Sequence, residues 1–225
     1  MVHVDALPGT PGNSKSVSEI VAQTLSDATI LLEEGMDAIM IENMHDRPYL
    51  NRKIGPEITA SLTAVAVELR KTTKIPLGIQ VLAGANKEAL AIALASGINF
   101  IRAEGFVFGH VADEGLIPSD AGELLRYRKQ IGAEHILIFT DIKKKHSSHT
   151  ITADISIEGT AKAAEFFLSD GIIVTGRATG EKTSVKDLER VNDATNLPVI
   201  IGSGIDIFNI QDYWNWADAF IVGSA

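Results

Sequence analysis

Short apolar runs alternate with longer stretches of helical periodicity along the whole chain. The runs begin at Val2, Ala38, Leu77, Phe100, Ile136, Ile172, Val199 and Ala219. Apolar runs of this length, bounded by turn residues, indicate buried strands. A single helix separates each strand from the next. The strands must therefore run parallel, because an antiparallel pair would need only a hairpin.

The intervening stretches carry the start and stop signals of helices. Ser16 and Glu19 form a capping-box pattern, and Pro56 stands at the first position of the second helix. Gly97 and Gly132 stand where helix C-caps belong. The inward face of the second helix is predicted to consist of Ile58, Leu62, Val65 and Leu69.

Eight parallel strands with helices between them favour closure into a barrel. We predict an α/β fold, a (β/α)8 TIM barrel, as a single domain over residues 1–225. The alternative is an open doubly wound sheet, which would place its glycine-rich turn after the first strand. Here the glycine-rich turns follow the last strands. No helix follows the run at Ala219, so we expect the final helix of the barrel to be missing from this chain.

Composition excludes several classes of partner. The net charge of -9 would repel phosphate backbones, so no nucleic-acid partner is expected. The chain has no cysteine, which excludes disulfides and thiolate metal sites. No apolar run is long enough to span a bilayer, and no signal peptide is recognisable, so we expect no membrane insertion and a cytoplasmic location.

Polar residues collect where the predicted strands end. Buried parallel strands are almost wholly apolar, so a polar side chain at a strand end faces solvent and ligand. These strand-end residues are His3, Asp5, Glu42, Asn43, Gln80, Arg102, Glu104, Asp141, Thr175, Ser203 and Ser224. Their position predicts a ligand site at the carboxyl ends of the strands.

The first two strands supply carboxylates for acid–base or metal chemistry. His3 and Asp5 are two residues apart and so share one face of the first strand. They could bind a divalent cation or form an imidazole–carboxylate pair, and the alternative for His3 is a hydrogen-bonded side chain that fills the barrel floor. Glu42 ends an otherwise apolar strand, where a carboxylate needs a cation or a raised pKa. Mg²⁺ or Mn²⁺ held by Asp5 and Glu42 is the candidate cofactor.

The fourth and fifth strands contribute further charges. Arg102 and Glu104 share a strand face, either for substrate binding or as a structural ion pair. Asp141 is followed by three lysines, 143–145, and by His146. Positive potential there would attract an anionic ligand, and a desolvated lysine could form a Schiff base. The alternative is an ordinary solvated loop.

Small-residue turns follow three successive strands. They are Thr175-Gly176, Gly202-Ser203-Gly204 and Gly223-Ser224. Glycine lets backbone N–H groups approach an anion closely, so these turns predict a phosphate site. A single turn of this kind would equally serve an ordinary strand-to-helix connection.

Two long loops follow strand ends. They cover residues 44–53 and 105–118. Loops of this length at the active face of a barrel are often lids. The alternative is a subunit interface, for which Phe106 and Phe108 are suited, and we expect a homo-oligomer.

The motifs together resemble the BtpA/SgcQ family over essentially the whole chain. The matching segments are Met1-Val2-His3, Leu7-Pro8-Gly9-Thr10-Pro11, Glu42-Asn43, Asp141 with Lys145-His146, Thr175-Gly176 with Thr179-Gly180, and Gly202-Ser203-Gly204. The resemblance implies a relationship to ribulose-phosphate-binding barrels. The family takes its name from a role in photosystem I biogenesis, while other members sit with sugar-metabolism proteins.

Two functions follow as hypotheses. The first is an enzyme that acts on a small phosphorylated metabolite, a sugar or nucleoside phosphate. Its catalytic candidates are Asp5, Glu42, Asp141, Lys145 and His146. Its substrate-binding candidates are His3, Asn43, Gln80, Arg102, Glu104, Thr175, Gly176, Gly202, Ser203, Gly204, Gly223 and Ser224. Isomerase, lyase and hydrolase chemistry would all use such a set. The second is a non-catalytic assembly factor for a membrane pigment–protein complex, which would have no need for desolvated strand-end carboxylates.

Overall fold

Parallel strands begin within one residue of each of the eight predicted positions in the computed structural model, which describes residues 1–176 and 183–223. The chain folds into two compact units. The first unit comprises residues 1–102 and 124–137, and the second comprises residues 103–123 and 138–225. Helix α4 (Ala121–Gln130) and strands β4 (Phe100–Ala103) and β7 (Leu137–Ile142) contribute residues to both units.

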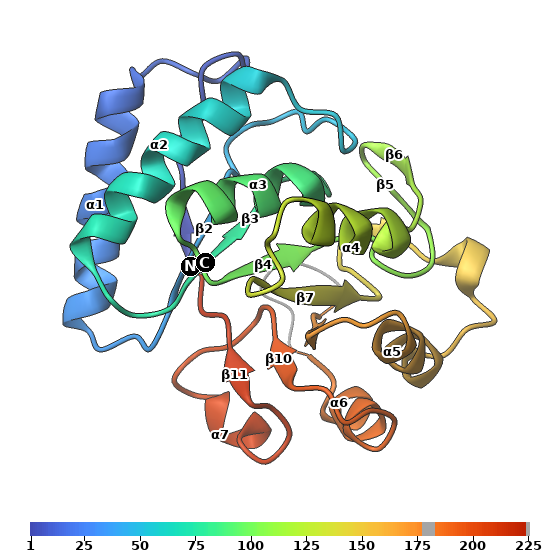
Figure 1. Cartoon of the computed structure of the whole chain (residues 1–225). Helices are drawn as coiled ribbons and strands as arrows, with labels where there is room; N and C mark the ends of the chain where they lie inside the picture. The colour runs from blue at the N-terminus through green and yellow to red at the C-terminus, as the bar shows by residue number, and fades with distance from the viewer. Residues whose placement is uncertain (177–182, 224–225) are drawn as a thin grey trace. The chain divides into compact units, whose positions relative to one another are not determined.

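The first unit is a parallel ladder with helices beside it. Strands β1 (Val2–His3), β2 (Ile39–Glu42) and β3 (Leu77–Gln80) pair in chain order, and β3 then pairs with β4. Helices α1 (Val17–Glu33), α2 (Pro56–Thr72) and α3 (Asn86–Ser96) lie side by side (Figure 1). Strands β2 and β3 are buried along their whole length, which explains their apolar sequence.

The helix signals in the sequence are confirmed. Ser16 is the N-cap of α1 within a complete capping box, and Pro56 occupies the first turn of α2. Gly97 caps α3 in the left-handed conformation that glycine adopts without strain. The predicted inward face of α2 is buried at all four positions, which are Ile58, Leu62, Val65 and Leu69.

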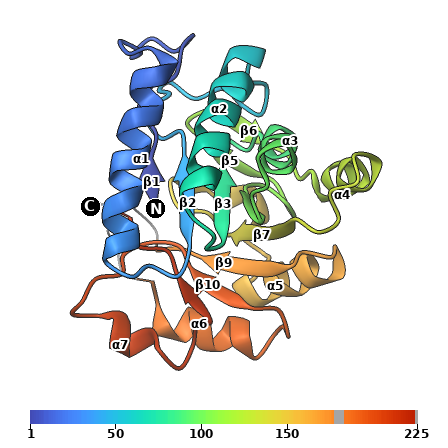
Figure 2. The same cartoon turned by 60° about the vertical axis from the view of Figure 1, so that its left-hand side comes forward.

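In the second unit, parallel strands again alternate with helices along the chain. Strand β7 pairs with β9 (Gly171–Val174), β9 with β10 (Val199–Ile201), and β10 with β11 (Ala219–Phe220), all in parallel. Helices α5 (Ile157–Phe166) and α6 (Val185–Asn192) pack beside β9 and β10, as Figure 2 shows, and the short helix α7 (Ile210–Tyr213) precedes β11. Its core is an apolar cluster that includes Ile142, Ile172, Val199 and Leu188.

The segment 105–118 differs from the predicted loop. It contains strands β5 (His110–Ala112) and β6 (Gly115–Ile117), which form an antiparallel hairpin, and β5 also pairs with β8 (Ser147–Ser148). The turn of the hairpin is short, and Gly115 adopts a positive φ of 99° there. Phe106 is completely buried, so the suggestion that it serves a subunit interface is wrong.

A buried hydrogen-bond network joins the ends of the first three strands. Asp46, in the 44–53 loop, accepts from the Leu7 backbone N–H at 2.7 Å and from the Asn43 side-chain amide at 2.8 Å. The side-chain oxygen of Asn43, Oδ1, in turn accepts from the Leu82 backbone N–H at 2.8 Å. Because all these groups are buried, the network fixes the loops that follow β1, β2 and β3 relative to one another.

The cap of α1 gives a first test of the fold. Replacing Ser16 with Ala removes the side-chain oxygen that accepts from the Glu19 N–H, and should lower the free energy of unfolding by about 1 kcal/mol. Urea denaturation measures this difference. The matched control is Ser18→Ala, an exposed serine within the same helix, which should change stability little. Equal losses in the two variants would contradict the role assigned to the cap.

The network around Asp46 gives a second test. Burial raises the pKa of the Asp46 carboxyl above its ordinary value of 3.8, although the Leu7 and Asn43 hydrogen bonds oppose that shift. The folded state therefore binds the proton more tightly than the unfolded state does. The contribution of Asp46 to stability should be largest below pH 3.8 and should fall as the pH rises through the raised pKa.

Urea unfolding of the wild type and Asp46→Asn across this pH range measures that contribution. The variant cannot titrate at this position, so the difference in unfolding free energy, wild type minus variant, should decrease as the pH rises. Ser18→Ala, at an exposed residue that does not titrate, is the control and should show no such trend. A difference that grows with pH would show that the pKa is lowered, not raised.

Candidate active site

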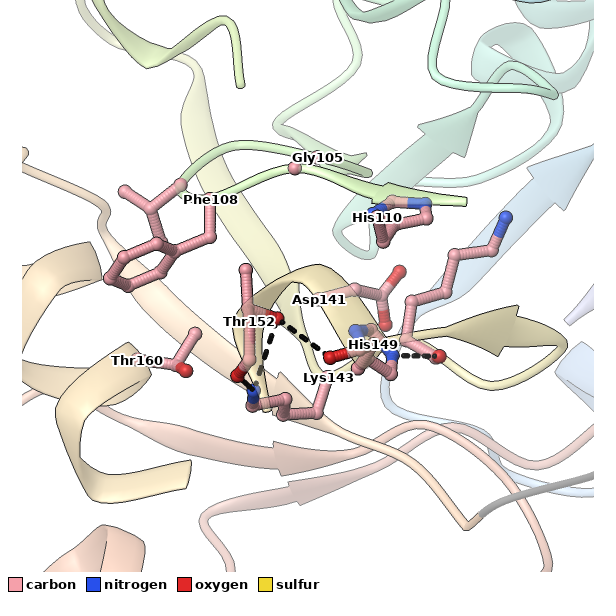
Figure 3. Close-up of a pocket in the computed structure, with 11 residues that line it drawn as sticks. Gly105, Phe108, His110, Asp141, Lys143, His149, Thr152 and Thr160 are labelled. Carbon is pink, nitrogen blue, oxygen red and sulfur yellow. Dashed lines mark hydrogen bonds between the residues drawn. The ribbon is translucent and has the colours of Figure 1, made fainter. Parts of the chain in front are cut away.

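A pocket lies in the second unit at the carboxyl end of β7. It spans about 310 Å³, including the part open to solvent. Figure 3 shows Asp141 between the rings of His110 and His149, with Lys143 extending toward Thr152. The pocket is lined by Gly105, Val107, Phe108, Gly109, His110, Asp141, Lys143, Lys144, His149, Thr152 and Thr160. Charged groups of both signs therefore meet at a strand end, which is the position that the sequence predicted for the site.

Lys144, which lines this pocket, forms a buried ion pair with Glu104. The Lys144 Nζ lies 3.0 Å from the Glu104 Oε2, and the two side chains are only 13% and 2% exposed. The sequence indicated Glu104 but left the choice among the three lysines open. An ion pair with so little solvent fixes both side chains, because separating the charges would leave each one buried without its partner.

Lys143 has different surroundings. Its Nζ donates to the Thr152 carbonyl oxygen at 3.0 Å and lies 3.4 Å from the Thr152 hydroxyl oxygen. Burial lowers the pKa of the Lys143 ammonium, and the charge of Asp154 opposes this only in part. Its backbone φ is +48°, a conformation that a non-glycine residue rarely adopts and that is concentrated at functional sites.

The two histidines of the pocket come from separate segments. His110 lies on β5, and His149 immediately precedes the 3₁₀ turn at Thr150–Thr152. Their ring centroids are 5.8 Å apart, and the His149 Nε2 is hydrogen-bonded to the Lys144 carbonyl oxygen at 2.8 Å. The sequence placed His110 in a lid and did not indicate His149, Thr152 or Thr160. Only the pairing of β5 with β8 brings these segments together.

Lys145 and His146, two of the predicted catalytic residues, do not line this pocket. The Lys145 backbone N–H donates to the Thr175 hydroxyl at 3.2 Å, and the His146 side chain is exposed. Their catalytic roles stay predictions. The hydrogen bond from Lys145 to Thr175 does connect the end of β7 with the end of β9.

The predicted anion-binding turns lie on neighbouring strands of the same unit. Because β10 pairs with both β9 and β11, the turns that begin at Thr175, Gly202 and Gly223 follow neighbouring strands at the same edge of the sheet. The Gly202 N–H donates to the Val174 carbonyl at 2.8 Å, and Gly204 has a φ of +74°. Gly223 is the last residue described, and Ser224 lies outside the described residues, as do Thr179 and Gly180.

Two hydroxyl groups near this edge are buried without a partner. Among the described residues, neither the Ser203 Oγ nor the Thr183 Oγ1 has a hydrogen-bond partner. Thr183 directly precedes Ser184, the N-cap of α6. A buried hydroxyl without a partner is costly, and a bound anion would supply the missing acceptor.

The remaining sequence candidates lie in the first unit. His3 Nε2 is 3.5 Å from the Glu42 Oε2, and Asp5 pairs with Lys15 at 2.7 Å beside a second cleft that includes Ser14, His45 and Arg47. The Asn43 side chain forms hydrogen bonds within the buried network around Asp46. Gln80 and Arg102 are buried at the ends of β3 and β4.

A metal centre is not apparent in the part of the chain that the structure describes. Residues 1–176 and 183–223 contain no group of three or more His, Asp or Glu side chains arranged to hold an ion. Asp5 forms its ion pair with Lys15, whereas Glu42 lies near His3. The divalent cation at Asp5 and Glu42 therefore stays a prediction.

Among the described helices, none has the length and apolar character that a membrane span requires.

Two solved structures with similar folds are enzymes whose names include a phosphate group. Orotidine 5'-monophosphate decarboxylase from Methanocaldococcus jannaschii has a TM-score of 0.56 at 15% identity, covering 98% of this chain and 90% of that enzyme. Phosphoribosyl anthranilate isomerase from Thermus thermophilus also has a TM-score of 0.56, at 12% identity, covering 88% and 82%. These enzymes are TIM barrels, so the predicted α/β-barrel fold class is confirmed.

Sequence relatives extend over the entire chain. An uncharacterized mitochondrial protein of Caenorhabditis elegans is 48% identical over all of this chain and 82% of its own length. The photosystem I biogenesis protein BtpA of Synechocystis is 34% identical over all of this chain and 78% of its own length. The profile of the BtpA family matches residues 1–225, and the chain belongs to this family.

Proposed function

We propose that this chain is an enzyme that acts on a small phosphorylated metabolite, a sugar or nucleoside phosphate. The observation that carries the proposal is the position of the small-residue turns Thr175-Gly176 and Gly202-Ser203-Gly204 at the ends of β9 and β10, in the same unit as the pocket of Asp141, Lys143 and Lys144. Backbone N–H groups at such turns, with the Ser203 hydroxyl, would hold the phosphate.

The pocket would then carry the reaction. Asp141 is a carboxylate able to move a proton, and the Glu104–Lys144 pair and the two histidines supply further polar groups beside it. Asp5, Glu42, Lys145 and His146 remain candidates for the same chemistry, as does a divalent cation, Mg²⁺ or Mn²⁺. Named enzymes with the same fold act on phosphorylated compounds, which agrees with the proposal without fixing the reaction.

A second candidate is a non-catalytic assembly factor. The observation in its favour is the name of the Synechocystis relative, a photosystem I biogenesis protein. A factor of that kind would need a contact surface but no pocket with a buried ion pair.

A cytoplasmic location stays a prediction, because the worm relative is described as mitochondrial.

The phosphate site is tested by thermal shift. Inorganic phosphate and a panel of sugar and nucleoside phosphates, each with and without Mg²⁺ or Mn²⁺, should include a ligand that stabilises the protein by about 2.7 kcal/mol at 100 times its Kd. Gly204→Val should abolish this stabilisation, because a β-branched residue cannot adopt the backbone conformation of the turn.

The control for this variant is Gly132→Val. Gly132 has a similar φ of +71° but lies in the turn after α4, in the first unit, so its substitution should strain the backbone and leave ligand binding intact. Ser203→Ala keeps the turn and should weaken binding by roughly 1 kcal/mol. Undiminished stabilisation of Gly204→Val by the ligand would remove the proposed phosphate site.

The predicted homo-oligomer, most simply a dimer, now depends on other residues than Phe106. Large apolar side chains of the second unit are exposed, among them Phe166, Ile207, Phe208 and Trp214. Exposed apolar groups of this size favour association. Sedimentation should show a dimer, and Phe208→Ser should shift it toward monomer. A strict monomer at micromolar concentration would contradict the prediction.

A further inference from the structure

We infer that Lys143 is a nucleophile that forms a Schiff base with a carbonyl group of the substrate, so that the proposed phosphorylated metabolite is an aldehyde or ketone. The inference deepens the proposed function and relies on it only for the phosphate. It rests on four features of the pocket, which concern the position of the amine, its hydrogen bonds, its neighbouring charges and the groups available to move protons.

Lys143 stands where a barrel enzyme presents its reactive groups. It follows β7 directly, at the carboxyl end of a buried strand, and it lines the pocket together with Asp141 (Figure 3). Its left-handed backbone turns the chain sharply after the strand. Two residues further on, the Lys145 N–H donates to the Thr175 hydroxyl, where the first of the anion-binding turns begins. A phosphate at these turns and a carbonyl carbon at Lys143 are therefore on the same side of the second unit.

The hydrogen bonds of Lys143 suit a neutral amine. A neutral lysine amine has two N–H donors and one lone pair, whereas the ammonium form has three donors. Among the described residues, the Nζ donates to the Thr152 carbonyl oxygen and lies 3.4 Å from the Thr152 hydroxyl oxygen. Two donors meet both oxygens and leave the lone pair available to attack a carbonyl carbon.

The neighbouring charges distinguish Lys143 from Lys144. The carboxylate of Glu104 is paired with Lys144, and within the described ranges Lys143 makes no ion pair. Burial lowers the pKa of Lys143, which increases the fraction of the amine that is neutral near pH 7. Lys144 is therefore a fixed cation of an ion pair, whereas Lys143 is the amine of this loop that can react.

The covalent step conserves atoms and charge. The lone pair of the neutral Lys143 Nζ forms a bond to the carbonyl carbon, and the carbonyl π electrons move to oxygen, which takes a proton. The nitrogen loses one proton, and the hydroxyl leaves as water after a second protonation, giving a protonated imine. Asp141 and His149 line the same pocket and are the groups placed to carry these protons. The net change is one carbonyl, one neutral amine and one proton converted to one iminium and one water.

The test is reductive trapping on the intact protein. The protein is incubated with dihydroxyacetone phosphate and sodium cyanoborohydride, which reduces an imine to a stable secondary amine, and the modified peptide is identified by mass spectrometry. The adduct should lie on Lys143. It should be lost in Lys143→Arg, which keeps a donor for Thr152 but has no neutral amine, and retained in Lys144→Arg, which keeps the ion pair with Glu104.

A structural role for Lys143 predicts a different result. If the side chain only caps the Thr150–Thr152 turn, labelling should follow exposure and favour surface lysines such as Lys71 and Lys129. That outcome would overturn the inference, and so would an adduct at Lys145. Circular dichroism of Lys143→Arg confirms that the variant is folded, so that a lost adduct reports the missing amine.

The same experiment with unphosphorylated dihydroxyacetone separates the inference from the proposed function. If dihydroxyacetone phosphate raises the melting temperature but neither probe leaves an adduct on Lys143, the phosphate site stands and the inference fails. If both probes label Lys143 equally and dihydroxyacetone phosphate gives no thermal shift, the nucleophile stands and the phosphate site fails. Selective labelling of Lys143 that is faster with the phosphorylated probe supports both.

Discussion

Burial of the parallel strands on both faces is the constraint on which the rest of this structure depends. Strands β2, β3, β9 and β10 have no exposed residue, so they cannot accommodate polar side chains except where the strand ends. The charged and amide side chains of these strands are therefore confined to the strand ends. The same constraint that makes the strands apolar thus gathers the chemistry at their carboxyl ends, where Glu42, Gln80 and Asp141 are found.

The two units differ in how far the buried polar groups at these strand ends are paired. In the first unit, Asp46 and Asn43 satisfy each other and two backbone N–H groups, and the result is a rigid connection between loops. In the second unit, Glu104 is satisfied by Lys144, whereas the Ser203 hydroxyl has no partner among the described residues. A fully satisfied network contributes structure, and an unsatisfied group is a place where a ligand would complete the hydrogen bonding.

The small antiparallel sheet of β5, β6 and β8 gives the second unit a feature that a plain alternation of strand and helix lacks. It joins the segment after β4 to the segment after β7, and it places His110 near His149. The pocket depends on this pairing, because residues 105–110 and 141–152 both line it. Family membership extends over the whole chain, whereas the lining of the pocket is decided by how these two segments meet.

The sequence by itself determined the order of strands and helices, the cap of α1, the buried face of α2 and the strand ends as the place of the candidate site. These are local properties, because periodicity, helix capping and the apolar character of a strand depend on residues that are close together in the chain. Tertiary structure alone decided that Phe106 is buried and that the Asn43 side chain forms hydrogen bonds with Asp46 and Leu82. It also decided that Lys143 and Lys144 have different surroundings. The two lysines are adjacent and chemically identical in the sequence. Only the interactions with Thr152 and with Glu104, which is forty residues away, make one a hydrogen-bonded amine and the other the cation of an ion pair.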